Sequence, residues 1–327
     1  MNCTSDILSE QGGTNTFATR LARARRDTGL NNAQLGVTRI YDNPHGYDFL
    51  RGHPGLPLSG EEVLIKDLQQ VAGEVTTMGS VHHSFVADYH DTTAHRLLAA
   101  GATLVGASAS AEFGTTAYTE PIGMPEPVNP LHPGMMVGGS SGGAAAALAS
   151  GTAWLAHGSD MGGSLRNPAS FCGVVGLRPS IGRVAHTPKF GIDRTLGVQG
   201  PMARNVEDLA LLLDAMSGEH AADPLSLPAL STSFLSATRS GNKPTRIAYS
   251  PDLGITPVDP EVKAVTRKAA ERFAEAGAIV EEAHPDLREA HECFHVLRAF
   301  DFAISKAELL RTKRDLLKPE VIWNIEA

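Results

Sequence analysis

Cysteine is scarce in this chain of 327 residues, which contains only Cys3, Cys172 and Cys293. Three widely separated cysteines form no disulfide framework and have no spacing typical of a metal site. We therefore expect a protein of a reducing compartment, namely the cytoplasm. Cys172 lies in the apolar run FCGVVG, and we expect it to be a buried packing residue.

Long apolar runs and a surplus of basic residues are also missing. No apolar run approaches the about 20 residues that span a bilayer, so we expect no membrane association. The N-terminal residues MNCTSDILSEQGG contain neither the basic region nor the apolar core of a secretory signal. The chain has 28 Lys and Arg against 36 Asp and Glu, which disfavours nucleic acid as a partner because no positive surplus neutralises phosphates.

Glycine, by contrast, is abundant, and its position beside serine is the most informative feature. The segment 138–182 begins with GGSSGG, which contains Ser140 and Ser141, and continues to SDMGGS, which ends at Ser164. Glycines permit unusual backbone dihedrals and expose N–H groups close to a hydroxyl. Acyl transfer needs a nucleophile, a route for its proton and donors for an oxyanion. This segment can supply the nucleophile and the donors for an oxyanion.

Helical patterns alternate with short apolar strands along the chain, which predicts an α/β fold. We expect a mixed, largely parallel central sheet covered by helices on both faces. The stretch that follows the first helix, through Gly55, is expected to be loop because it is rich in Asn, Gly, His and Pro. Residues 221–244 are expected to be a surface connection. The predicted helices are 17–26, 92–101, 205–216 and 259–276, and the predicted strands are 63–65, 103–106, 246–249 and 278–280.

Three motifs together resemble the amidase signature family of serine hydrolases. They are GGSSGG, the run GSDMGGSLRNPASFCGVVGLRPSIGRV, and the segment VLIKD, which ends in Lys66 and Asp67. The resemblance implies a Ser–cis-Ser–Lys triad in which Ser164 is the nucleophile, Ser140 the cis-serine and Lys66 the base. It extends from about Pro57, so we expect a lead-in at 1–56 and the amidase signature domain at 57–327. Because family members continue further, we expect a shortened relative or a fragment.

The resemblance also implies the remaining members of the site, with no metal and no cofactor. Lys66 would be neutral because burial lowers the pKa of a lysine, and it would accept the proton of Ser140, which accepts that of Ser164. The expected oxyanion donors are the backbone N–H groups of Met161, Gly162, Gly163 and Ser164. Residues expected to support the site or contact substrate are Gly139, Ser141, Asp160 and Arg166.

The function implied by the resemblance is hydrolysis of a carboxylic amide to an acid and an amine or ammonia. A small-molecule amide is the expected partner, and a homodimer is a candidate assembly. The alternative is an inactive or partner-dependent amidotransferase-like subunit, or a truncated pseudo-amidase. The intact Lys66, Ser140 and Ser164 favour activity, whereas the missing C-terminal portion favours the alternative.

Two further motifs suggest other chemistry. GGSSG at 138–142 fits the G-x-S-x-G nucleophile elbow of α/β-hydrolases, but that motif should follow a strand, and here a proline-rich loop precedes it. HECFH at 291–295 fits the H-E-x-x-H zinc motif. We expect both of its histidines to lie on a polar helix flank without a third ligand, so neither motif changes the expected function.

Overall fold

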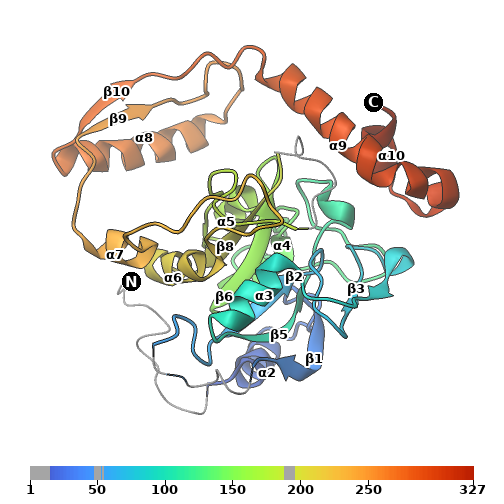
Figure 1. Ribbon diagram of the computed structural model, residues 1–327. Coiled ribbons are helices and arrows are strands. Elements are labelled where there is room, and N and C mark those ends of the chain that lie inside the picture. The colour runs from blue at the N-terminus through green and yellow to red at the C-terminus, as the bar shows by residue number, and fades with distance from the viewer. Residues whose placement is uncertain (1–14, 48–52, 54, 188–195) are drawn as a thin grey trace.

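The computed structural model describes residues 15–47, 53, 55–187 and 196–327. Their central feature is a six-stranded mixed sheet with the strand order β1-β5-β2-β6-β8-β7 (Figure 1). The inner strands β5, β2 and β6 pair in parallel, while β1 and β8 join them antiparallel and β7 pairs antiparallel with β8. The strands are β1 (Val37–His45), β2 (Glu62–Lys66), β5 (Thr103–Ser108), β6 (Leu155–Asp160), β7 (Val175–Gly176) and β8 (Val198–Ala203).

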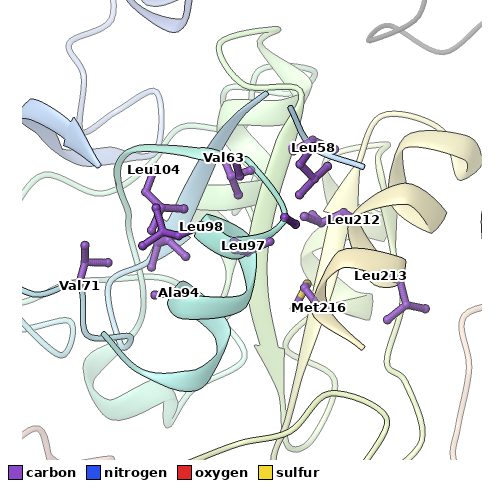
Figure 2. Close-up of a cluster of buried hydrophobic side chains, with 14 of the residues drawn as sticks. Leu58, Val63, Val71, Ala94, Leu97, Leu98, Leu104, Leu212, Leu213 and Met216 are labelled. Carbon is purple, nitrogen blue, oxygen red and sulfur yellow. The ribbon is translucent and has the colours of Figure 1, made fainter. Parts of the chain in front are cut away.

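Helices cover both faces of this sheet, as the sequence predicts. On one face, α3 (Thr92–Ala99) and α6 (Val206–Met216) bury leucines against Val63 and Leu104, and Figure 2 shows these side chains meeting. On the other face, α2 (Phe17–Thr28) and α4 (Gly142–Ala149) pack around Leu64 and Val105. Val63 and Leu64 lie on opposite faces because successive side chains of a strand alternate. Two buried faces explain why β2 is a continuous apolar run before its lysine.

Helix α4 can approach the sheet closely because its first turn has no bulky side chains. A β-carbon on Gly143 would lie 2.2 Å from the backbone nitrogen of Ala109, and one on Gly36 would lie 2.1 Å from the carbonyl oxygen of Gly143. Neither position can therefore carry a side chain. The backbone of α4 lies directly on the ends of β1 and β5, and this contact places the GGSSGG turn above β2.

The remaining elements lie outside the central layers. The segment before α3 forms a small antiparallel pair, and the C-terminal third forms a parallel pair with its helix and then a helical hairpin, which Figure 1 shows at the periphery. Within the part of the chain that the structure describes, no helix combines the length and apolarity needed to cross a bilayer. The outer elements are β3 (Val75–Thr76), η1 (Val81–His83), β4 (Phe85–Val86), η2 (Glu112–Gly114), α7 (Phe234–Arg239), β9 (Arg246–Tyr249), α8 (Pro260–Glu275), β10 (Ile279–Glu282), α9 (Ala290–Lys313), η3 (Arg314–Leu316) and α10 (Pro319–Glu326). Helix α5 (Arg166–Phe171), in contrast, packs in the same core as α4.

The bounds of the predicted strands and helices agree with the structure to within two residues, but the loop prediction for the stretch through Gly55 is wrong in part. Residues 37–45 form β1, which buries Val37 and Tyr41 against the sheet. Its pairing with β5 has two register shifts, and irregular edge strands tolerate the Asn and Pro that suggested a loop. The surface connection at 221–244 is also not entirely irregular, because it contains α7.

Candidate active site

The last residue of β2, Lys66, is fully buried at the centre of a cluster of hydroxyl groups. Its amine donates hydrogen bonds to Ser140 Oγ at 2.8 Å, to Ser141 Oγ at 2.9 Å and to Ser159 Oγ at 3.0 Å. The structure therefore places Lys66 beside Ser140 and Ser141, which come from a separate motif. Ser159 is a further partner that the sequence analysis did not identify.

Burial lowers the pKa of Lys66 from 10.5 to about 7, although the negative charge of Asp160 partly opposes this shift. Removing an ammonium from water disfavours its charged form, and the three hydroxyl groups bonded to it are neutral. The neutral form of the Lys66 amine is therefore accessible near pH 7. A neutral amine with a free lone pair can accept a proton from a neighbouring hydroxyl group.

The GGSSGG turn is fixed in place by contacts with its neighbours. The peptide bond between Gly139 and Ser140 is cis, and the N–H of Gly139 donates to Asn167 Oδ1 at 2.9 Å. A β-carbon on Gly139 would lie 2.5 Å from the carbonyl carbon of Tyr118, so only glycine fits there. No strand precedes this turn within residues 117–137, and the nucleophile-elbow geometry is therefore absent from this described segment.

Ser164 lies beside the lysine cluster, in the turn between β6 and α5. Its carbonyl oxygen accepts a hydrogen bond from the N–H of Ser141 at 3.3 Å, which ties the two serine motifs together. Its side chain forms no hydrogen bond with any residue that the structure describes. Ser164 is 9% exposed, whereas Ser140 is 1% exposed. Of the three predicted triad members, Ser164 is thus the one that an incoming molecule reaches most easily.

The turn before Ser164 presents backbone N–H groups, but not all four that were predicted as donors. The N–H of Gly163 already donates to Asp160 Oδ1 at 2.9 Å, so Gly163 is not a free donor and that prediction needs correction. The N–H groups of Met161, Gly162 and Ser164 have no acceptor among the described residues. These three remain candidate donors for an oxyanion.

Asp160 is the anchor of this turn. Its buried carboxylate accepts two hydrogen bonds from Arg166, at 2.9 and 3.0 Å, one from Arg178 at 3.0 Å, and one from the N–H of Leu165 at 3.2 Å. Burial alone would raise the pKa of Asp160, but the hydrogen bonds from Arg166 and from the N–H groups of Gly163 and Leu165 outweigh it and lower the pKa to about 2. Asp160 and Arg166, predicted to support the site or contact substrate, therefore brace the turn.

A second buried polar group lies beneath Lys66. His157 Nδ1 accepts the backbone N–H of Lys66 at 3.5 Å, and its Nε2 lies 2.8 Å from Gln199 Oε1. Burial, followed by the nearby Lys66, lowers the pKa of His157 to about 3, so the imidazole is neutral. His157 and Ser159 are two residues apart on β6 and therefore lie on the same face of the strand. This alternation along β6 is the feature of the sequence that could have placed both residues beside Lys66.

The H-E-x-x-H motif lies on α9, where His291, Glu292 and His295 are exposed. Among the described residues, no group of three His, Cys, Asp or Glu side chains could hold a metal ion. Phe294, in the middle of the motif, instead packs against Gly162: a β-carbon on that glycine would lie 2.9 Å from Cζ of the ring. The apolar residue of the motif, and not its histidines, contacts the site.

Comparison with known proteins assigns this chain to a family. The amidase family model matches residues 32–323. The chain is 41% identical over 246 residues to a glutamyl-tRNA(Gln) amidotransferase subunit of Thermus thermophilus, covering 75% of this chain and 52% of that protein. It is 41% identical over 230 residues to an acylamidase of Rhodococcus erythropolis, covering 70% and 48%. The chain thus spans about half the length of the curated relatives that it matches.

Solved structures give the same result. A bacterial aryl acylamidase of the amidase signature family superposes with a TM-score of 0.81 at 25% identity, covering 95% of this chain and 69% of that one. The 6-aminohexanoate cyclic dimer hydrolase superposes with a TM-score of 0.79 at 26% identity, covering 96% and 69%. With its lysine and serines in this arrangement, the chain belongs to the amidase signature family.

Proposed function

We propose that this protein hydrolyses a carboxylic amide through an acyl-enzyme on Ser164. The observation that carries the proposal is the buried Lys66 amine, with its pKa lowered to about 7, at 2.8 Å from Ser140 Oγ. A general base works best when its pKa lies near the working pH. Lys66 accepts the proton of Ser140, which accepts the proton of Ser164 as Ser164 Oγ attacks the amide carbonyl.

The tetrahedral intermediate places a negative charge on the former carbonyl oxygen. The free N–H groups of Met161, Gly162 and Ser164 stabilise this charge, because preorganised donors act where charge develops. Collapse of the intermediate breaks the C–N bond, and Ser140 protonates the leaving amine with the proton returned by Lys66. Water then attacks the acyl-enzyme by the same proton route in reverse, which releases the acid and regenerates Ser164.

Asp160 and Arg166 support this chemistry without taking part in it. Their ion pair holds the turn that carries both the nucleophile and the donors, and Ser141 and Ser159 orient the lysine amine between them. We propose a small-molecule amide as the substrate and the cytoplasm as the compartment. The scarcity of cysteine supports the latter.

A second candidate function is that of an amidotransferase component, which would deliver ammonia to a partner. The similarity to a glutamyl-tRNA(Gln) amidotransferase subunit favours it, since that relative is as similar as the acylamidase. The two candidates share the acyl-enzyme and differ in whether the isolated chain turns over free amides.

The test uses the purified protein, a fluorophosphonate probe and a panel of simple amides. We expect the probe to label Ser164, as located by peptide mass spectrometry, and both Ser164→Ala and Lys66→Ala to lose turnover by several orders of magnitude. Ser236→Ala is the matched control because Ser236 is exposed on α7. Folded protein that neither labels nor hydrolyses, or activity that persists in Ser164→Ala, would refute the proposal. Labelling without hydrolysis favours the amidotransferase-like function.

A further inference from the structure

Helix α9 turns one stripe of side chains toward the segments that form the site. Phe294, Arg298, Phe302 and Lys306 are four residues apart and therefore lie above one another on one helix face. Arg298 donates to the carbonyl oxygen of Thr115, and Phe302 is buried in a cluster that also contacts Met161. The stripe thus joins α9 to two segments. One contains Thr115, and the other is the turn that contains Met161 and Ser164.

Phe294 contacts the turn that carries the candidate oxyanion donors. Its ring edge lies against Gly162, because a β-carbon on that glycine would be 2.9 Å from Cζ of the ring. Gly162 is exposed and its N–H is one of the three free donors. A carbonyl oxygen bound to these donors brings the groups attached to its carbon next to this ring.

The ring of Phe294 is held in place by the rest of the stripe. The guanidinium of Arg298 lies 5.7 Å from the centroid of Phe294 and 5.3 Å from that of Phe302, distances typical of cation–π contacts. Arg298 is itself fixed by Thr115 and by the side chain of Asn324. The aromatic surface at Gly162 is therefore preorganised, which reduces the entropy that a bound group would lose by ordering it.

A second ring lies on the Ser140 side. Phe113 adopts a left-handed conformation, with φ of 49°, and its N–H donates to the carbonyl oxygen of Met78 at 2.8 Å. The next residue, Gly114, touches the cis-serine, since a β-carbon there would lie 3.3 Å from Ser140 Oγ. The Lys306 amine lies 4.8 Å from the centroid of Phe113. Phe113 also packs against the cluster that contains Phe302, so the same cluster joins α9 to the segment beside Ser140.

We propose that Phe294 is a specificity-determining residue that selects amides with an aryl ring attached to the scissile group. This inference rests on the proposed function, because it places the substrate carbonyl at the N–H groups of Met161, Gly162 and Ser164. Flat aromatic groups gain energy from stacked or edge-to-face contacts with a fixed ring beyond the area that they bury. An alkyl group of similar size gains only the burial.

The test compares Phe294→Ala with Phe300→Ala, a matched control on the same helix whose ring is 45% exposed. Substrates are benzamide, with the ring on the acyl side, acetanilide, with the ring on the amine side, and cyclohexanecarboxamide, whose alkyl ring matches the aryl ring in size. We expect Phe294→Ala to lower kcat/KM about three- to tenfold more for an aryl amide than for cyclohexanecarboxamide. The aryl amide whose kcat/KM falls more shows whether the ring binds on the acyl side or on the amine side of the scissile bond.

A binding measurement separates this inference from the proposed function. In the Ser164→Ala background, calorimetry with benzamide, acetanilide and cyclohexanecarboxamide reports on the aromatic surface without turnover. Preferential aryl binding that disappears in Ser164→Ala/Phe294→Ala supports the inference even if the wild type hydrolyses nothing, in which case only the proposed function fails. Equal losses for aryl and alkyl amides, or the same change in Phe300→Ala, would overturn the inference.

Discussion

Replacing Lys66 by Met should change how the stability of the protein depends on pH. The pKa of Lys66 is about 7 in the folded state and 10.5 in the unfolded chain. Between these values the unfolded chain binds the additional proton, so the free energy of unfolding rises with pH. The unfavourable contribution of the buried lysine is fully present below pH 7 and disappears as the pH approaches 10.5. The methionine side chain has a similar length and does not titrate.

The size of the effect follows from these pKa values. At pH 7 the folded state holds about half a proton on Lys66, and at pH 9 almost none, while the unfolded state holds nearly one throughout. With about 1.36 kcal/mol per pH unit for a full proton, the wild type should gain about 2 kcal/mol of unfolding free energy relative to Lys66→Met between pH 7 and pH 9. Other titrating groups cancel in this comparison because both proteins contain them.

Urea denaturation of both proteins at pH 7, 8 and 9 measures this difference directly. Ser164→Ala is the control, since Ser164 is not among the hydroxyl groups bonded to the lysine amine, and its curve should run parallel to that of the wild type. In the same pH range, kcat/KM of the wild type should rise through about pH 7 and then level off. Parallel stability curves for wild type and Lys66→Met would show that the pKa of Lys66 is not depressed, and the proposed base would be wrong.

Three further substitutions test the surroundings of the site. Asp160→Asn should lower the free energy of unfolding by about 3 kcal/mol at pH 7, because an amide cannot replace a buried, fully bonded carboxylate. Chemical denaturation measures this loss. The loss should shrink as the pH falls toward 2, where the wild-type carboxylate becomes protonated. Gly139→Ala should abolish soluble, folded protein, since its β-carbon meets the backbone of Tyr118 at 2.5 Å, whereas Gly134→Ala, with nothing within 4 Å, should fold normally as judged by circular dichroism. Ser159→Ala removes one of the hydroxyl groups that stabilise the charged amine, so the pH at which kcat/KM is half-maximal should move down by up to about one unit; an unchanged profile would contradict this.

The parts of the fold that the sequence predicts are those whose pattern is local. The strand that ends at Lys66 and the helix at 205–216 bury mainly apolar side chains, so composition and period identify them. Strand β8, by contrast, contains Gly200 and Pro201, residues that usually mark loops. It exists because it pairs with β6 over six residues, and pairing between distant segments leaves no period in the sequence.

The residues of the site also divide into those that a local motif identifies and those whose contacts depend on distant segments. Motifs identify Lys66, Ser140 and Ser164, and the structure places the first two in direct contact. The engagement of Gly163 by Asp160 depends on how the turn folds back on the strand end, which a glycine pair does not specify. The contact between Phe294 and Gly162 joins residues 132 positions apart, so neither motif indicates it.

The bare backbone contact of α4 with β1 and β5 has a consequence for redesign. Gly36 and Gly143 meet without any side chain between them, so no rotamer change can absorb a shift of the serine turn. The glycines beneath the serine turn should therefore tolerate substitution least. Helix α9 should tolerate it most, because only side chains of this helix border the site. Libraries that seek new substrates are best confined to that helix, which leaves the catalytic framework untouched while the boundary is rebuilt.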